Sequence, residues 1–181
     1  VDGQHFTAFI VERAMPGVSS GKEEHKMGLL GSSTTSVLLQ DVRVPADNVL
    51  GEVGKGHRVA FNVLNFGRLK LGFMCNGGSI AVVGESARYA ATRQQFGHPI
   101  ATFGAIKHKI GEMSVRAYAL ESMLYRTAGL LDAAINERQT SREDMAAVLA
   151  AGEEDAVEAS IAKVAGSEVA VFRGHEDLVW F

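Results

Sequence analysis

Apolar residues recur every three or four positions along the segment 103–135. The recurring positions are Phe103, Ile106, Ile110, Met113, Ala117, Leu120, Leu124, Ala128, Leu131 and Ile135. In a helix with 3.6 residues per turn this spacing places all of them on one face. The pattern therefore predicts one long amphipathic helix whose apolar face packs against other elements.

The preceding segment, 57–92, also indicates a helix, although it contains five glycines. They are Gly67, Gly72, Gly77, Gly78 and Gly84. A glycine inside a helix costs about 1 kcal/mol relative to alanine. So many of them predict close packing of another backbone or of a ligand against this helix.

A third helical stretch is expected from about Ser141 or Arg142 to about Gly174, after a polar break over 136–140. Gly152 could interrupt it. Pro99 is the only proline after residue 50, and we expect the two long helices to meet near Gly97 to Pro99. Residues after about 56 are therefore predicted to form three or four antiparallel helices joined by short turns.

The first fifty residues indicate β structure instead. The predicted strands are 7–12, which stops before Pro16-Gly17, then 36–40, and then 42–44, which ends at Pro45. We expect residues 21–26 to form a polar loop. The predicted fold class is α+β, with a partial antiparallel β domain over 1–53 and a truncated helical-bundle domain over 54–181.

Two features lead us to expect that the chain is an internal piece of a longer protein. Two or three isolated strands are marginally stable in water and expose unpaired edges. The chain also starts without an initiator Met and stops abruptly at apolar residues, Trp180 and Phe181. We therefore expect further strands before Val1.

Composition narrows the possible functions. A net charge of −3 and a pI near 6.1 argue against a nucleic-acid binder, which would usually be basic. The single cysteine, Cys75, excludes an internal disulfide, and we expect a buried, inert thiol. No apolar run approaches the roughly 20 residues that a membrane-spanning helix needs.

Two arginines are candidates for function, and each has a plainer interpretation. Arg93 follows a predicted helix, where its planar guanidinium suits a phosphate group. It could equally complement the dipole at the helix end. Arg68 lies in an apolar helix and needs hydrogen-bond partners if it is buried. In that case it would tie neighbouring elements together.

Other polar residues offer no clear catalytic site. We expect the helical glutamates to lie on solvated faces or in ion pairs; they are Glu85, Glu112, Glu121, Glu158, Glu168 and Glu176. His108 and Glu112 are one turn apart, but no second pair of ligands accompanies them. We therefore predict no metal site.

Four segments together carry a resemblance to a known family. They are Arg93-Gln94-Gln95-Phe96-Gly97-His98-Pro99-Ile100, Gly67-Arg68, Gly31-Ser32-Ser33-Thr34-Thr35 and Asp41-Val42-Arg43-Val44-Pro45. With these segments the chain resembles the acyl-CoA dehydrogenases, FAD-dependent enzymes that desaturate acyl-CoA thioesters. The resemblance extends to about Phe172 and is strongest to the very-long-chain subgroup.

The resemblance implies roles for four residues. Arg93 matches the family arginine that contacts the FAD pyrophosphate of a neighbouring subunit, and Phe96 matches a phenylalanine against the same cofactor. Asn65 and Arg68 match a segment that lines the acyl-CoA site. Many members have Gln at the position of Gly104, so that contact with FAD is missing here, as in the very-long-chain subgroup.

The resemblance also implies that this chain lacks the catalytic base. Some subfamilies place a catalytic Glu immediately before the family arginine, where this chain has Gly67. The base is therefore expected beyond Phe181. Val179 stands where the family has a Gln before its paired glycines, so the match weakens there. The chain alone is expected to be inactive.

The implied function is the first step of fatty acyl-CoA β-oxidation. The resemblance implies an acyl-CoA substrate, electron-transfer flavoprotein as acceptor and assembly into a homo-dimer or tetramer. It implies a cytoplasmic location in a bacterium or a mitochondrial one in a eukaryote. The alternatives are a redox-inactive helical scaffold or assembly protein of this family, and a generic helical interaction module.

Overall fold

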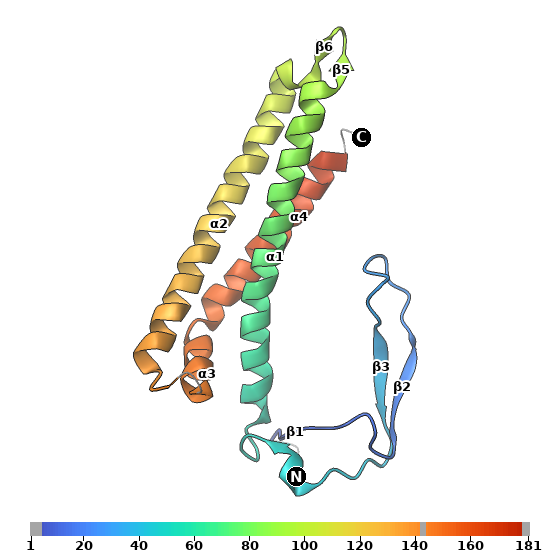
Figure 1. Cartoon of the computed structure of the whole chain (residues 1–181), viewed down its shortest axis with the longest axis vertical. Coiled ribbons are helices and arrows are strands. Elements are labelled where there is room, and N and C mark those ends of the chain that lie inside the picture. Colours follow the sequence, from blue (N-terminus) through green and yellow to red (C-terminus); the bar gives the residue numbers. More distant parts are fainter. Residues whose placement is uncertain (1–4, 142–143, 179–181) are drawn as a thin grey trace. The chain divides into compact units, whose positions relative to one another are not determined.

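The computed structural model describes residues 5–141 and 144–178, with the backbone alone for 175–178 (Figure 1). The chain divides into two compact units, one running up to Ala60 and the other beginning at Phe61. Short strands make up the first unit, whereas helices dominate the second. This is the partial β domain followed by a helical bundle that the sequence predicts.

Strands in the first unit pair as two antiparallel ribbons. One ribbon joins β1 (Ala8–Phe9) to β4 (Val49–Leu50), and the other joins β2 (Val18–Glu23) to β3 (Thr35–Leu39). The second pairing is irregular between Ser20 and Glu23. A short 3-10 helix, η1 (Ala46–Asn48), precedes β4.

Three details of the predicted β structure are wrong. The strand expected over 42–44 is absent from the described residues, and the strand expected over 7–12 shortens to β1. The loop expected over 21–26 instead begins after β2. The Glu23 carboxylate accepts hydrogen bonds from the Thr34 amide at 2.7 Å and from Ser33 Oγ at 2.9 Å. Cross-strand pairing therefore extends a strand whose own residues are mostly small and polar.

The second unit contains the predicted long helices. They are α1 (Gly56–Thr92, which starts within the first unit), α2 (Gly104–Arg138), α3 (Met145–Glu154) and α4 (Ala156–Leu178). Between α1 and α2 lie β5 (Gln94–Gln95), β6 (His98–Pro99) and η2 (Ile100–Thr102). The predicted meeting of two long helices near Gly97 to Pro99 is confirmed.

The interruption of the third helical stretch falls at Asp155 and not at Gly152, where the sequence placed it. Gly152 lies inside α3, and a Cβ atom there would come within 2.8 Å of the Phe66 ring. The glycine therefore allows α3 to approach α1 closely, and it does not end a helix. The last helix also continues past Gly174 to Leu178.

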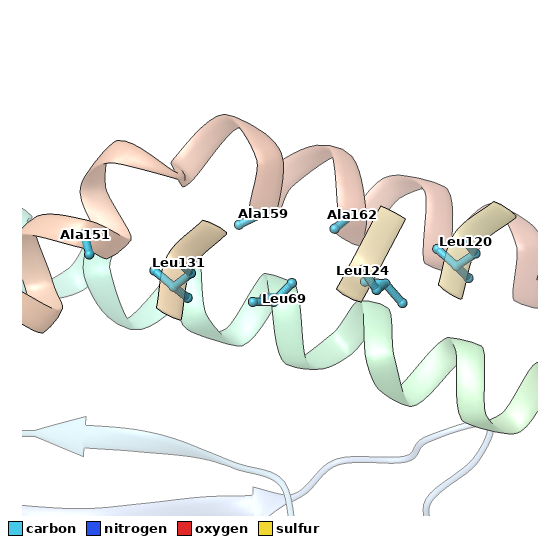
Figure 2. Close-up of a cluster of buried hydrophobic side chains, with 7 residues drawn as sticks. All are labelled: Leu69, Leu120, Leu124, Leu131, Ala151, Ala159 and Ala162. Carbon is cyan, nitrogen blue, oxygen red and sulfur yellow. The ribbon is translucent and has the colours of Figure 1, made fainter. Parts of the chain in front are cut away.

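The core of the second unit lies between α1, α2 and the α3–α4 pair (Figure 2). Its buried side chains are Leu69, Leu120, Leu124, Leu131, Ala151, Ala159 and Ala162. Leucines from α2 meet alanines from α3 and α4, so the helices pack closely. At the crossing of α1 and α4, a Cβ atom on Gly166 would lie 3.0 Å from the Gly72 Cα atom.

Only one of the five glycines in the predicted segment 57–92 packs closely against another backbone of the chain. A Cβ atom at Gly72 would come within 2.7 Å of Leu124 Cδ2 and 3.1 Å of the Ala162 carbonyl oxygen. Around Gly67, Gly77 and Gly78 a Cβ atom would meet no atom of the chain within 4 Å. Cys75, expected to be buried, is partly exposed.

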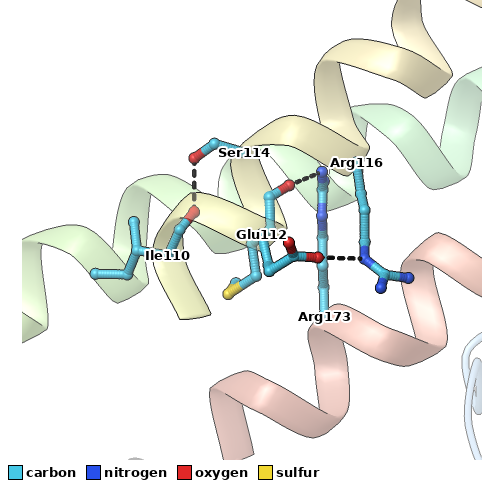
Figure 3. Close-up of polar contacts among 6 residues, drawn as sticks. Ile110, Glu112, Ser114, Arg116 and Arg173 are labelled. Carbon is cyan, nitrogen blue, oxygen red and sulfur yellow. Dashed lines mark hydrogen bonds and ion pairs between the residues drawn. The ribbon is translucent and has the colours of Figure 1, made fainter. Parts of the chain in front are cut away.

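Polar contacts at the α2–α4 contact centre on a buried arginine (Figure 3). Arg173 is 1% exposed and donates a hydrogen bond from Nη2 to the Met113 carbonyl, while its Nε and Nη1 have no partner among the described residues. Burial lowers the pKa of Arg173. Beside it, Arg116 pairs with Glu112 at 3.3 Å and lies 4.0 Å from the centre of the Phe172 ring.

The described residues contain neither a membrane-spanning helix nor a cluster of metal ligands. None of their helices is both long enough and apolar enough to cross a membrane. They also contain no group of three or more His, Cys, Asp or Glu side chains that could hold a metal ion.

Candidate cofactor and substrate surfaces

The first candidate surface is the hairpin that follows α1. Gln94 pairs with Pro99 and Gln95 with His98, which leaves Phe96 and Gly97 as a two-residue turn. Both turn residues have positive φ, +54° and +82°, as a type I′ hairpin requires. The Ile100 amide donates to the Arg93 carbonyl at 2.8 Å, which closes the hairpin immediately after the helix.

The hairpin presents two predicted cofactor residues to solvent. The Arg93 side chain is exposed and makes no hydrogen bond or ion pair with the described residues. Phe96 is 90% exposed. Its ring packs edge-on against the Phe103 ring, with 6.2 Å between the two ring centres. A positive φ is unfavourable for a bulky residue, so the backbone holds this ring outward at some cost.

The second candidate surface contains both predicted substrate residues, which the structure brings together on α1. Asn65 is 5% exposed and donates from Nδ2 to the Gly152 carbonyl at 3.0 Å. Arg68 is half-buried and donates from Nη1 to Asn65 Oδ1 at 3.0 Å and to Ser160 Oγ at 3.2 Å. Arg68 thus links α1 to α4, in agreement with the plainer interpretation of this residue.

A small cavity of about 10 Å³ lies against the same network. Its lining residues are Asn65, Phe66, Leu69, Thr127, Leu131, Gly152, Asp155 and Ala159. That volume is close to the minimum for one water molecule. Asp155 Oδ2 is buried without a partner among the described residues, and burial raises the pKa of Asp155, with Glu158 and Glu154 adding to the effect.

Sequence reasoning missed Asp155 and Ser160, which lie at the helix break and one turn beyond it. Nothing in the local pattern distinguishes Ser160 from other helical serines, because its partner Arg68 is 92 positions away in the sequence. Asp155 follows two other acidic residues, Glu153 and Glu154, and resembles part of a solvated run.

The described glutamates occupy the settings that the sequence indicated. Glu85 pairs with Arg88 at 2.5 Å, and Glu112 pairs with Arg116 at 3.3 Å. Glu158 and Glu168 are exposed, and Glu121 is partly exposed. The side chain of Glu176 lies outside the described residues, as does Val179, which stands where the resembled family has a Gln. Gly67 is exposed on α1, where a side chain would meet open space.

Comparison with known proteins decides the family. Residues 54–177 match the family model described as "Acyl-CoA dehydrogenase, C-terminal domain". The chain belongs to the acyl-CoA dehydrogenase family. It is 49% identical over 171 residues to a probable acyl-CoA dehydrogenase of Bacillus subtilis (strain 168), covering 93% of this chain and 28% of the relative.

A mitochondrial relative supports the subgroup that the residues indicated. The very long-chain specific acyl-CoA dehydrogenase of Rattus norvegicus is 38% identical over 167 residues, covering 92% of this chain and 23% of that protein. The chain therefore spans about a quarter of the length of these acyl-CoA dehydrogenases. The predicted resemblance to the family, including its very-long-chain members, is confirmed.

A solved structure bears on the cofactor. The acyl-CoA dehydrogenase of Bacillus anthracis, solved in complex with FAD, is 47% identical and superimposes with a TM-score of 0.92. The likeness covers 99% of this chain and 31% of that one. FAD is the cofactor of this family, as the sequence predicted.

Proposed function

We propose that this chain is part of an FAD-dependent enzyme that introduces an α,β double bond into fatty acyl-CoA. Its family membership supports the type of reaction. The exposed hairpin supports the proposal that Arg93 and Phe96 bind the cofactor. Bound FAD supplies the two-electron redox chemistry, while the protein orients the reactants and sets the electrostatics. The domain boundary is proposed between residues 53 and 54.

Arg93 and Phe96 would hold the cofactor. A guanidinium without an internal partner offers two parallel hydrogen bonds to a phosphate group. The Phe96 ring, raised on a fixed two-residue turn, offers an apolar face beside it. An unpaired cation next to an outward-pointing ring fits a ligand that is both anionic and aromatic, and this is the observation on which the proposal rests.

Asn65 and Arg68 would form part of the acyl-CoA surface, and the catalytic base would come from beyond Phe181. Removal of an α-proton needs a carboxylate within hydrogen-bond reach of the substrate. Gly67 offers no side chain, and Glu85 and Glu112 are already paired with arginines. The 181-residue chain alone should therefore not turn over acyl-CoA.

The proposal can be tested on the full-length protein with Arg93→Ala. The loss of a charge-assisted contact costs about 1.5–3 kcal/mol, which corresponds to a roughly ten- to hundredfold weaker affinity for FAD. The measurement is FAD content after purification and the FAD dissociation constant. Arg88→Ala is the matched control, because Arg88 is also exposed near the end of α1 but is paired with Glu85.

Unchanged FAD binding in Arg93→Ala would show that Arg93 only complements the end of α1. A full-length protein that binds no flavin would favour the redox-inactive scaffold instead. The wider assignments are also proposals from the family resemblance. They are electron-transfer flavoprotein as acceptor, a homo-dimer or tetramer, and a cytoplasmic location in a bacterium or a mitochondrial one in a eukaryote.

A further inference from the structure

We propose that Ser160, which lies on the neighbouring helix α4, is a positioning residue. Its hydroxyl holds the Arg68 guanidinium in the orientation needed for substrate binding. The inference rests on the proposed substrate role of Arg68 and adds to it. Ser160 lies on a different element from Arg68, and its hydroxyl is one of two groups that accept a hydrogen bond from Arg68 Nη1.

The hydrogen-bond directions at Ser160 are determined. Its Oγ donates to the Ala156 carbonyl at 2.7 Å, one turn earlier in α4. A serine hydroxyl has one proton, so this bond uses its only donor and leaves the lone pairs as acceptors. Arg68 Nη1 donates to that oxygen at 3.2 Å. The acceptor therefore has a fixed orientation before any substrate arrives.

A second anchor fixes the other acceptor of Arg68. Asn65 Nδ2 donates to the Gly152 carbonyl, which orients the amide so that Oδ1 faces Arg68. Gly152 is held closely under the Phe66 ring. The two anchors lie on either side of the break at Asp155, so α3 and α4 together determine where the guanidinium lies.

This arrangement leaves the rest of the guanidinium available. Both bonds use Nη1, and Nε and Nη2 have no partner among the described residues. Arg68 is half-buried, so these N–H groups can reach a ligand at the surface of α1. A planar group fixed along one edge binds a carbonyl or phosphate oxygen with less loss of side-chain freedom than a mobile one.

The test uses Ser160→Ala in the full-length enzyme, with a saturated long-chain acyl-CoA as substrate and anaerobic bleaching of the flavin as the assay. We expect KM to rise about three- to tenfold, the effect of one lost hydrogen bond. FAD content should stay unchanged. Ser160→Thr, which keeps the hydroxyl, should restore KM to within about twofold of the wild-type value.

Ser167→Ala is the matched control. Ser167 also lies on α4, and its Oγ donates to the Val164 carbonyl of the same helix at 2.9 Å. A purely local serine should leave KM unchanged. If Ser160→Ala unfolds too readily to assay, Ser160→Cys keeps the side-chain volume with a weaker acceptor and should raise KM in the same direction.

Arg68→Met separates this inference from the proposed function. If Ser160 acts through Arg68, Ser160→Ala should raise KM no further in the Arg68→Met background. Two outcomes would overturn the positioning role alone. One is that Ser160→Ala raises KM as much in the Arg68→Met background as in the wild type. The other is that Ser160→Ala has a wild-type KM although Arg68→Met raises KM. A wild-type KM for Arg68→Met would overturn the substrate role of Arg68 and the inference with it.

Discussion

The two long helices of the second unit bury opposite kinds of residue. The buried positions of α2 are mostly large and apolar: Met113, Leu120, Leu124, Thr127 and Leu131. On α1 they are mostly small or polar: Asn62, Asn65, Leu69, Asn76, Ser79, Ser86 and Ala90. Two helices of similar length in one bundle are therefore held in place by different kinds of buried residue.

The exposed sides of the two helices are alike, since α2 also exposes large side chains such as Val115, at 65%; the contrast lies in what each helix buries. Phe61, Val63 and Met74 are 58%, 68% and 68% exposed, although large apolar side chains are favoured inside proteins. Hydrophobic packing explains where α2 lies, because its apolar face meets α4. On α1, Leu69 joins the apolar core, and the helix is further fixed by a polar network through Asn65 and Arg68 and by a glycine contact at Gly72. The helix whose buried residues are mostly small or polar carries the proposed substrate residues.

The largest effect is expected from Leu124→Ala, which removes a fully buried side chain from the apolar face of α2. Leu→Ala changes in cores cost about 2–5 kcal/mol. Urea unfolding of the protein measures the loss of stability. Val115→Ala, at an exposed position of the same helix, should change it by less than about 0.5 kcal/mol. Equal losses at both positions would show that α2 is not held by that face.

Replacing a glycine of α1 by alanine should lower the stability of the fold on the packed side of the helix and raise it on the open side. Gly72→Ala places a methyl group against Leu124 and the Ala162 backbone, which should cost about 1–3 kcal/mol through overpacking. Gly77→Ala meets no atom and should stabilise the helix by up to about 1 kcal/mol. Thermal unfolding of both variants compares them directly. If Gly72→Ala raises the melting temperature, α1 and α4 do not approach as closely as described.

The smallest effect concerns pH. Burial raises the pKa of Asp155 in the folded state, so its charged form opposes folding at neutral pH. Asp155→Asn should therefore be more stable than wild type at neutral pH. The difference should shrink as pH falls through the raised pKa, because wild-type Asp155 then becomes neutral. Unfolding curves across that pH range measure the difference.

Asp144 gives a control of opposite sign. Hydrogen bonds from the Ala147 amide and from Thr140 lower the pKa of Asp144, which caps the start of α3. Its carboxylate stabilises the fold at neutral pH, and that stability is lost as pH falls through the lowered pKa. Asp144→Ala should thus be less stable than wild type at neutral pH. If both variants change stability in the same direction, the pKa shifts do not act as described.

Local pattern was enough to predict α2, because its apolar period is regular over ten positions. The extent of α1 was also predicted, but which of its sides is buried was not, since its apolar residues do not mark the packed face. The break at Asp155 was missed because a helix interior tolerates Gly152 when close packing requires it. Similarly, β2 depends on partners in β3 that are distant in sequence.

The residues of the proposed site also fall into two groups, those that the local sequence reveals and those that only the folded structure reveals. Arg93, Phe96, Asn65 and Arg68 were found because each stands in a recognisable segment of sequence. Ser160 and the Gly152 carbonyl could not be found, since a serine in a helix and a backbone oxygen carry no pattern of their own. Their contribution exists only after α3 and α4 fold back onto α1.

The turn at Phe96 has a consequence for protein design. Asn or Gly adopts a positive φ more readily than phenylalanine at the first position of this turn. A sequence chosen only for the stability of this chain would therefore replace Phe96, and the outward-facing ring would be lost. Design of a more stable version should keep Phe96, because its proposed contact with FAD contributes nothing to the stability of the isolated chain.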